Sequence, residues 1–380
     1  MRQLGEKRSR VSAVKILAIA ALVTILGATI IKLLSLERFF FKGPQTVIQL
    51  ITDSGLKSDN RRINILLLGT AGGDHEGPDL SDTIMLASID KDGDDTVLIS
   101  IPRDLWAPSL EAKINHAYAY GQEKEGDQGL ELARDTVRRL FDLPIHYAVR
   151  VDFDGFIKAV DLVGGLDLVI DKSFIDERYP IPGKENELCG LTIETQEING
   201  IPIEVIKDAT GSAMPIAEIT DQNNPFVCRY ETLTFKQGLT RMDGKTALKF
   251  ARSRHGTNGE GSDFSRSARQ QKVILAFREK VFSAQTFFDP KIIIDLVKTF
   301  DAAIDTNIQN DEIPLFIKLS QKVNHTKVRT VVLDSERPES VLVPGDPANY
   351  KGQFVLEPKN GTWTDLAEYV QGEIFKLEEK

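Results

Sequence analysis

The stretch INILLLG, residues 63–69, is a continuous apolar run that ends in glycine. Such a run is typical of a strand buried on both faces of a sheet. Two further strands are predicted after it, at residues 83–89 and 96–101, and the Asp92-Gly93 pair between them indicates a hairpin. The chain therefore predicts a sheet whose first strands are consecutive.

Helical and strand patterns alternate along the rest of the chain. Apolar spacing predicts helices at 114–120, 130–141, 153–163, 243–251, from 263 onward, 290–300, 312–323 and 364–378. Further strands are predicted at 147–151, 166–170 and 327–333. Residues 171–232 break the pattern into short pieces rich in Pro, Gly and Asn, which indicates an insertion. The alternation predicts an α/β fold, an α-β-α sandwich around a central mixed sheet.

The N-terminus carries a membrane signal. Basic residues precede an apolar run at 11–36, in which 16–31 hold no charge. This predicts a transmembrane helix at 11–36, after a cytoplasmic tail at 1–10 and before a linker at 37–61. The main domain is then extracytoplasmic, in a single-pass protein of the cell membrane. A cleaved signal peptide is the alternative, but no small-residue cleavage site precedes the charged flank, which favours the anchor.

The overall charge and the cysteines limit the partners and the compartment. The formal net charge is -9, so nucleic acid is a poor partner. Cys189 and Cys228 are the only cysteines. An extracytoplasmic domain permits a disulfide between them, which we favour over two buried thiols.

One arginine is predicted to face the protein interior. In the helix from Asp263, Arg266 and Gln270 lie on the same stripe as Val273 and Phe277, because residues three and four apart are neighbours. A buried guanidinium is costly unless an anion meets it. Planar, permanently charged arginines are suited to phosphate, so this pattern predicts a diphosphate-binding site.

Other polar residues gather around the same loop-to-helix turn. Arg252 and Arg254 are expected on an extended segment after the preceding helix, and Arg269 follows on the next one. The helix N-terminus adds partial positive charge. Asp82 and Arg103 are predicted at the ends of neighbouring strands, where ligand sites are common. A carboxylate beside a diphosphate implies a bridging cation, Mg²⁺ or the related Mn²⁺.

Each of these residues also has a structural interpretation. Arg103 could form an ion pair with Asp104, Asp82 could cap its strand end, and Arg269 could be a solvated charge. Gly69, Gly72 and Gly73 do not form a phosphate-binding Walker loop, because no Gly-Lys-Ser/Thr follows. The combination is more specific than any one motif.

That combination resembles the LytR-CpsA-Psr family of cell-wall proteins. The motifs that carry the resemblance run in order from Asn64 to Phe282. They are Ile65 to Thr70, Ser81-Asp82-Thr83, Ser100 to Asp104, Lys113 to Tyr118, Val151-Asp152-Phe153, Gly164 to Asp167, Met242 to Leu248, Ala251 to Arg254, Asp263 to Arg266 and Arg269-Gln270-Gln271. The resemblance implies a catalytic domain at 62–285, with the insertion at about 171–232, and residues 286–380 completing or flanking it.

The resemblance also implies an activity. Such proteins move a glycopolymer from an undecaprenyl-diphosphate carrier to peptidoglycan, forming a phosphodiester, with the 6-hydroxyl of N-acetylmuramic acid as the acceptor. By motif matching, Asp82 would bind Mg²⁺, and Asp82 and Arg103 would be catalytic. The polyprenyl tail would lie in an apolar tunnel between the sheet and its helices. The diphosphate would be bound by Arg103, Arg252, Arg254, Arg266 and Gln270, and we add Arg269 from its position.

One position departs from the family pattern. The aspartate that usually follows the Gly-Thr of the first strand is Ala71 here, and we expect Asp74 to reach back as a second metal ligand. The loss also permits an alternative function, a non-catalytic binder or regulator of lipid-linked wall precursors. A lipid-diphosphate pyrophosphatase that uses water as the acceptor is a further alternative.

Overall fold

The computed structural model describes most of the chain after the predicted linker. The described residues are 55–73, 77–124, 127–198, 201–220, 223–281, 283, 295, 304–323 and 327–376. The predicted cytoplasmic tail and transmembrane helix, Asp74 and the helix predicted at 290–300, except residue 295, lie outside these ranges. Within them, no helix is long and apolar enough to cross a membrane.

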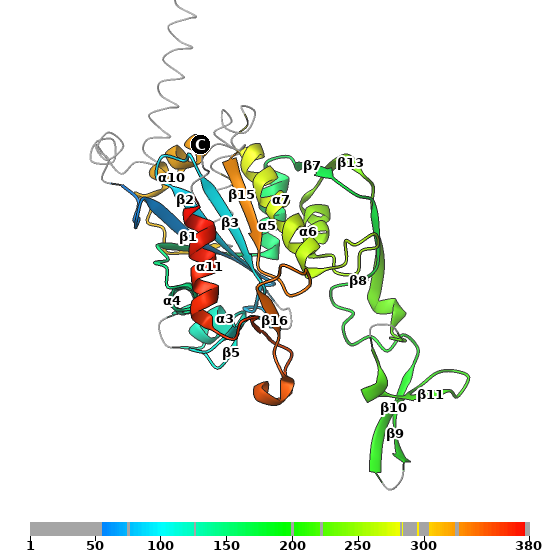
Figure 1. Ribbon diagram of the computed structural model, residues 1–380. Coiled ribbons are helices and arrows are strands. Elements are labelled where there is room, and N and C mark those ends of the chain that lie inside the picture. Colours follow the sequence, from blue (N-terminus) through cyan, green and yellow to red (C-terminus); the bar gives the residue numbers. More distant parts are fainter. Residues whose placement is uncertain are drawn as a thin grey trace, which may run out of the picture.

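A six-stranded mixed sheet forms the centre of the molecule, in the order β14-β6-β1-β2-β3-β15 (Figure 1). The strands are β1 (Arg62–Thr70), β2 (Ser81–Asp90), β3 (Thr96–Ile101), β6 (Tyr147–Asp152), β14 (Ile304–Thr306) and β15 (Val328–Val332). β1, β2 and β3 are antiparallel neighbours, whereas β6 is parallel to β1 and β15 is parallel to β3. The predicted hairpin at Asp92-Gly93 is confirmed, and Gly93 has a φ of 77° that glycine adopts without strain.

Helices cover both faces of this sheet. Leu66 on β1 faces a core shared with α3 (His116–Gln122), α4 (Gly129–Phe141) and α11 (Trp363–Phe375). Ile65, one residue earlier, faces the opposite core, to which α7 (Asp263–Val281) and α10 (Ile313–Lys322) contribute. Successive strand residues point to opposite faces, so a run buried on both faces needs apolar residues throughout. The predicted sandwich with a central mixed sheet is confirmed.

A second packing unit lies beside the sheet and shares α7 with it. It contains α5 (Phe153–Leu162), α6 (Gly244–Arg252) and the antiparallel pair β7 (Leu166–Ile170) and β13 (Gly238–Met242). Aspartates cap both helices: Asp152 accepts from Gly155 N at 2.7 Å and Asp243 from Thr246 N at 2.8 Å. Val273 of α7 packs into this core, so α7 joins the two units. β13 was not predicted from the sequence.

The insertion is an ordered arm built from strands. β8 (Phe174–Pro180) pairs with β12 (Tyr230–Phe235) at its base, and β9 (Thr192–Ile198), β10 (Ile201–Lys207) and β11 (Ala213–Pro215) form a separate sheet. Figure 1 shows this outer sheet extending away from the central one. Cys189 and Cys228 form a disulfide with 5.6 Å between their Cα atoms, which confirms the predicted pairing.

The C-terminal part completes the central sheet and both of its helical layers. It supplies β14 and β15 to the sheet, α11 to one face and α10 to the other. Between β15 and α11 in the sequence, β16 (Leu342–Pro344) pairs with β17 (Leu356–Pro358). A short pair, β4 (Trp106–Ala107) and β5 (Ala112–Lys113), follows β3.

Candidate functional site

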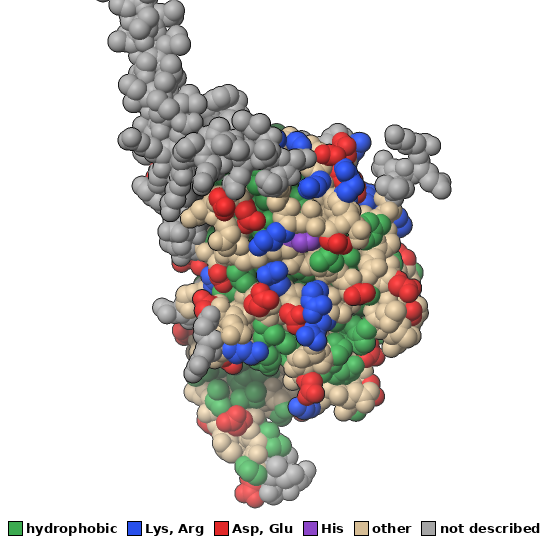
Figure 2. All heavy atoms as spheres, turned by 90° about the vertical axis from the view of Figure 1, so that its left-hand side faces the viewer, with side chains coloured by type: hydrophobic (Ala, Val, Ile, Leu, Met, Phe, Trp, Pro, Cys, Tyr) green, Lys and Arg blue, Asp and Glu red, His purple; other side chains and the backbone are tan. Residues whose placement is uncertain are grey.

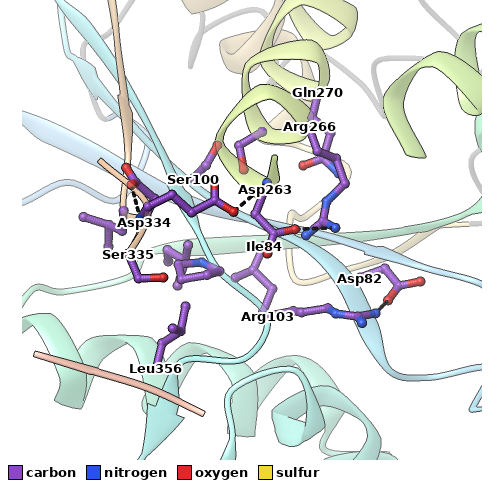
Figure 3. A pocket seen from close by; sticks show the side chains of 15 residues that line it. Asp82, Ile84, Ser100, Arg103, Asp263, Arg266, Gln270, Asp334, Ser335 and Leu356 are labelled. Atoms are coloured by element: carbon purple, nitrogen blue, oxygen red, sulfur yellow. Dashed lines mark hydrogen bonds and ion pairs between the residues drawn. The ribbon is translucent and has the colours of Figure 1, made fainter. Parts of the chain in front are cut away.

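The site lies at the edge of the sheet where β2 begins and β3 ends. Ile84 of β2 is opposite Ile101 of β3, so the polar residues just beyond this pair are brought together. Asp82 accepts a hydrogen bond from Arg103, with 2.7 Å between Oδ1 and Nη1 (Figure 3). The expectation that these two residues sit at neighbouring strand ends is confirmed.

Arg103 is held from two sides. Its Nε lies 3.6 Å from Asp104 Oδ2, and Asp104 is itself paired with Lys113 Nζ at 2.7 Å. Burial opposes the charge of Arg103, but the neighbouring Asp82 outweighs it and raises the pKa of the guanidinium. The buried Nε has no hydrogen-bond partner within the described part of the chain. Arg103 therefore stays charged and keeps donor capacity at this edge.

The first turns of α7 provide the second group of charges. Arg266 Nη1 lies 2.7 Å from Asp263 Oδ1, and Arg254 Nη2 approaches the same oxygen at 3.4 Å. One carboxylate oxygen thus faces two guanidinium groups. Gln270, one turn further on, donates weakly to Ala251 O at 3.5 Å. Figure 3 shows Arg266 and Arg103 reaching toward the same space from α7 and from the end of β3.

The electrostatics of Arg266 show how crowded this positive charge is. Its side chain is only 10% exposed. Burial, and then the nearby charge of Arg254, lower the pKa of Arg266 to about 10, and Arg103 adds to the effect although Asp263 and Asp82 oppose it. The guanidinium remains protonated at neutral pH. An anion entering here would therefore relieve repulsion that the two carboxylates leave uncompensated.

Two adjoining hollows meet at these side chains. Asp82, Arg103, Arg266 and Gln270 border both of them. The wider is a cleft of about 270 Å³, which is also bordered by the insertion through Arg178, Tyr179, Pro180 and Tyr230. Five arginines and two aspartates line it. On the side of the molecule shown in Figure 2, by contrast, acidic and basic side chains are interspersed.

The narrower hollow leads toward the apolar interior. Its nonpolar lining is Ile84, Ile101, Pro102, Leu333 and Leu356. It measures about 20 Å³, which is room for a water molecule but not for a lipid. The predicted tunnel for a polyprenyl chain is therefore not open at this edge, where the side chains of the sheet and its helices pack against one another.

Arg252 is placed differently from the expectation. It is the last residue of α6 and does not stand on the extended segment after it. Its guanidinium lies over the ring of Phe153, 4.1 Å from the centroid, and borders the wide cleft. Because α6 ends at Arg252, Arg254 leaves the helix and turns toward Asp263.

Arg269 is not brought to the cleft. Its side chain is 3% exposed and is used inside the protein. It donates to Phe250 O at 2.9 Å, to Ser253 O at 2.5 Å, and to Glu260 through both the carbonyl and the carboxylate at 2.8 Å. A guanidinium with these acceptors has little left to offer a ligand.

The carboxylates fit a cation only together with a substrate phosphate. Asp74 lies outside the described residues, and within those residues no group of three metal-ligating side chains occurs. Near Ala71, Asp79 and Asp152 are engaged by Arg150, whose Nη atoms lie 3.8 Å and 3.4 Å from their oxygens. Asp82 borders both hollows, and Mg²⁺ commonly takes one or two carboxylates plus phosphate oxygens. The donor set therefore fits Mg²⁺ once a phosphate is present.

Asp263 and Asp176 are among the residues near the site that were given no role by the sequence. Asp263 was part of a motif, and its position three residues before Arg266 could have suggested their ion pair. Asp176 is fully buried and contacts the arginine segment, the residues from Ser253 to His255 that follow α6. It lies in the insertion, where no sequence pattern indicated a role. Its partners after α6 are separated from it by more than seventy positions in the sequence.

A known family has the same sequence pattern as this chain. The model of the LytR_cpsA_psr family matches residues 43–345, and the chain belongs to this family. Two solved structures show a similar fold. B. subtilis TagV is 21% identical, with a TM-score of 0.52 over 83% of this chain and 98% of that one. Protein gbs0355 from Streptococcus agalactiae is 19% identical, with a TM-score of 0.53 over 84% of this chain and 90% of that one.

A more particular relative is named for its activity. The chain is 28% identical over 261 residues to the polyisoprenyl-teichoic acid–peptidoglycan teichoic acid transferase TagU of Oceanobacillus iheyensis. The match covers 67% of this chain and 61% of the relative. The chain thus spans less than two thirds of that relative's length.

Proposed function

We propose that this protein transfers a glycopolymer from a polyprenyl-diphosphate carrier to peptidoglycan. Family membership and the transferase name of its relative support the reaction class. The observation that carries the proposal is the convergence of Arg103, Arg254 and Arg266 on one cleft, where Asp82, Asp104 and Asp263 are their carboxylate partners. A diphosphate carries the charge and the planar acceptor pattern that such a cluster binds.

The reaction exchanges the phosphoanhydride bond of the diphosphate for a new phosphate ester bond. A hydroxyl oxygen of peptidoglycan bonds to the phosphorus that carries the glycan, and the bond from this phosphorus to the bridging oxygen breaks. The polyprenyl monophosphate leaves, and its phosphate takes up the proton of the acceptor hydroxyl. Phosphoryl transfer needs mainly positioning and charge stabilisation. Arg103 and Arg266, which border both hollows, would bind the oxygens on either side of the bond that breaks.

Asp82 is the residue that would hold Mg²⁺. Its carboxylate lies at the junction of the two hollows and is 32% exposed. A bound Mg²⁺ would neutralise charge between this carboxylate and the phosphate oxygens. Arg103 orients Asp82 through their hydrogen bond of 2.7 Å.

The two hollows suggest where the ends of the donor lie. The narrow one continues between apolar side chains, so the lipid would enter there, after the sheet and its helices have moved apart. The wide cleft, bordered by the insertion, would take the glycan and the acceptor. The predicted span at residues 11–36 would hold the domain on the outer face of the membrane, near a lipid-linked donor.

A reconstitution separates this function from its alternatives. The full chain in detergent is incubated with a polyprenyl-diphosphate-linked glycan, Mg²⁺ and peptidoglycan. Glycan covalently attached to peptidoglycan through a phosphodiester supports transfer. Phosphate products formed equally well without peptidoglycan indicate a pyrophosphatase, and retention of the unaltered donor indicates a binder; either result would overturn the proposal.

A further inference from the structure

We infer that Asp176 and Arg269 are positioning residues, which hold the backbone between α6 and α7 so that Arg254 faces the cleft. The inference rests on the proposed function, since it assigns these residues to the diphosphate site. Neither acts on the ligand directly. Together they bind the two kinds of backbone group, N–H and C=O, of one short segment.

Asp176 binds the donors of this segment. Its Oδ2 accepts from Ser253 Oγ at 2.6 Å, from Arg254 N at 3.1 Å and from His255 N at 3.3 Å. Its Oδ1 accepts from Arg178 N at 2.9 Å. The side chain has no exposed surface. Burial alone would raise the pKa of Asp176, but the Ser253 hydroxyl and the backbone amides hold it below its ordinary value.

Arg269 binds carbonyl acceptors at the end of α6 and in the same segment. Its Nε donates to Phe250 O at 2.9 Å and its Nη2 to Ser253 O at 2.5 Å. Its Nη1 reaches Glu260 further along. Ser253 is thus held by Asp176 through its hydroxyl and by Arg269 through its carbonyl. Hydrogen bonds to charged groups are stronger than those between neutral groups, so the segment is fixed from both sides.

The segment needs this support because of its own sequence. It lies past the end of α6, and Gly256 and Gly259 follow, the latter at a φ of 81°. Glycines allow many backbone conformations, so the loop alone would not orient the side chain of Arg254. Arg254 is 40% exposed and meets Asp263 only at 3.4 Å, so its position depends on its backbone.

The clamp also connects the insertion to the site. Asp176 lies in β8, the first strand of the insertion, and forms an isolated bridge with Gly256. Arg269 lies on α7, three residues after Arg266. The arginine segment is therefore fixed between the insertion and α7, the helix that supplies Arg266 to the proposed diphosphate site.

A double-mutant cycle tests the positioning role. The variants are Asp176→Asn, Arg254→Ala and the double variant, measured for transfer to peptidoglycan. We expect Asp176→Asn alone to lower kcat/KM by about tenfold to a hundredfold, because a misplaced Arg254 would bind the diphosphate poorly in the transition state. In the Arg254→Ala background it should lower kcat/KM by less than about twofold, because the two residues act as a unit. Losses that multiply in the double variant would overturn the inference.

A milder variant guards against misfolding. Ser253→Ala removes one hydrogen bond to Asp176 and leaves the others. The thermal midpoint should fall, because a buried hydrogen bond to a charged group is lost, but the variant should stay folded at the assay temperature. We expect about a fivefold loss of transfer, again dependent on Arg254. Transfer at the wild-type rate would count against the clamp.

The matched control is Asp208→Asn. Asp208 is another carboxylate of the insertion that accepts from backbone amides, Thr210 N at 2.9 Å and Ser212 N at 3.0 Å. Unlike Asp176, it is exposed, and it lies between β10 and β11 in the outer sheet of the insertion. It should leave transfer unchanged.

Binding of geranylgeranyl diphosphate separates the proposed function from the inference about Asp176 and Arg269. If the wild type fails to bind it, the proposed function fails; if the wild type binds and the cycle is additive, only the clamp fails.

Discussion

The two ends of the central sheet use the same residue types for different purposes. At the end where β1 begins, Asp95 receives Arg62 at 2.8 Å and Arg329 at 2.9 Å. Arg62 also donates to the hydroxyl and carbonyl of Ser88, at 3.0 Å and 3.2 Å. Arg329 donates to Glu373 O, in the last turn of α11, at 2.6 Å. At this closed end, the guanidinium groups are satisfied by the protein itself.

At the opposite end the guanidinium groups exceed their partners. Arg254 and Arg266 share one oxygen of Asp263, and the buried Nε of Arg103 has no hydrogen-bond partner among the described residues. The pKa of Arg266 is lowered to about 10, mainly by burial and then by Arg254. The comparison teaches that the number of arginines does not mark a binding site. Donor capacity left unused in a partly buried place does.

The largest effect is expected at the open end. Arg266→Ala should reduce transfer by at least about a hundredfold, because it removes a ligand for the charge of the transition state. The fold should survive, since Asp263, which is 40% exposed, keeps Arg254 as a partner. Transfer rates and circular dichroism measure the two effects. Arg329→Ala at the closed end is the matched control, and equal losses in both variants would remove the distinction between the ends.

The next effect concerns the cation. Chelation of divalent ions should lower wild-type transfer by about tenfold or more, and Mg²⁺ or Mn²⁺ should restore it. Asp82→Asn should be slow and should no longer respond to added Mg²⁺. Titration of the rate with Mg²⁺ in both proteins checks this. An unchanged wild-type rate in chelator would show that the open end works through its arginines alone.

The closed end should respond in stability instead. Arg62→Ala should lower the free energy of unfolding by about 2 kcal/mol, because the side chain is buried and its loss leaves the Ser88 hydroxyl without its charged donor and Asp95 with Arg329 alone. Transfer at 25 °C by the folded protein should be unchanged. Urea denaturation and the transfer rate are measured on the same sample. If Arg62→Ala were slow in transfer but as stable as the wild type, the closed end would have a functional role and not a structural one.

A smaller effect is expected in acid. Burial alone would raise the pKa of Asp95, but Arg329 and Arg62 outweigh it and lower that pKa. A lowered pKa contributes stability above the unfolded value of about 3.9, and this stability is lost as the pH falls through the folded value. Asp95→Asn should therefore lose less stability than the wild type between pH 5 and about pH 3. Denaturation midpoints at several pH values test this, and parallel curves would contradict it.

Much of the fold follows from local patterns in the sequence. β1, β2 and β3 are predicted because each is a compact apolar run, and α7 is predicted because its apolar spacing is helical. The same helical spacing placed Arg266 and Gln270 on a partly buried face, as the structure has them. These inferences need only residues near one another in the chain.

The remainder depends on contacts between distant segments. Arg269 is only three residues from Arg266, yet it turns toward the carbonyls at the end of α6, and nothing in α7 itself specifies those carbonyls. Asp176 likewise gains three of its four hydrogen-bond partners from a segment 77 to 79 positions away. β13 escaped prediction because its short run, with alternate residues exposed, follows directly on the insertion.

The most direct test of the central claim is calorimetric binding of geranylgeranyl diphosphate to the full chain in detergent. Geranylgeranyl monophosphate serves as the matched ligand. The account predicts that the wild type and Arg329→Ala bind the diphosphate more tightly than the monophosphate, and that Arg266→Ala loses this preference. Equal affinity of the wild type for the two ligands, or an undiminished preference in Arg266→Ala, would contradict it.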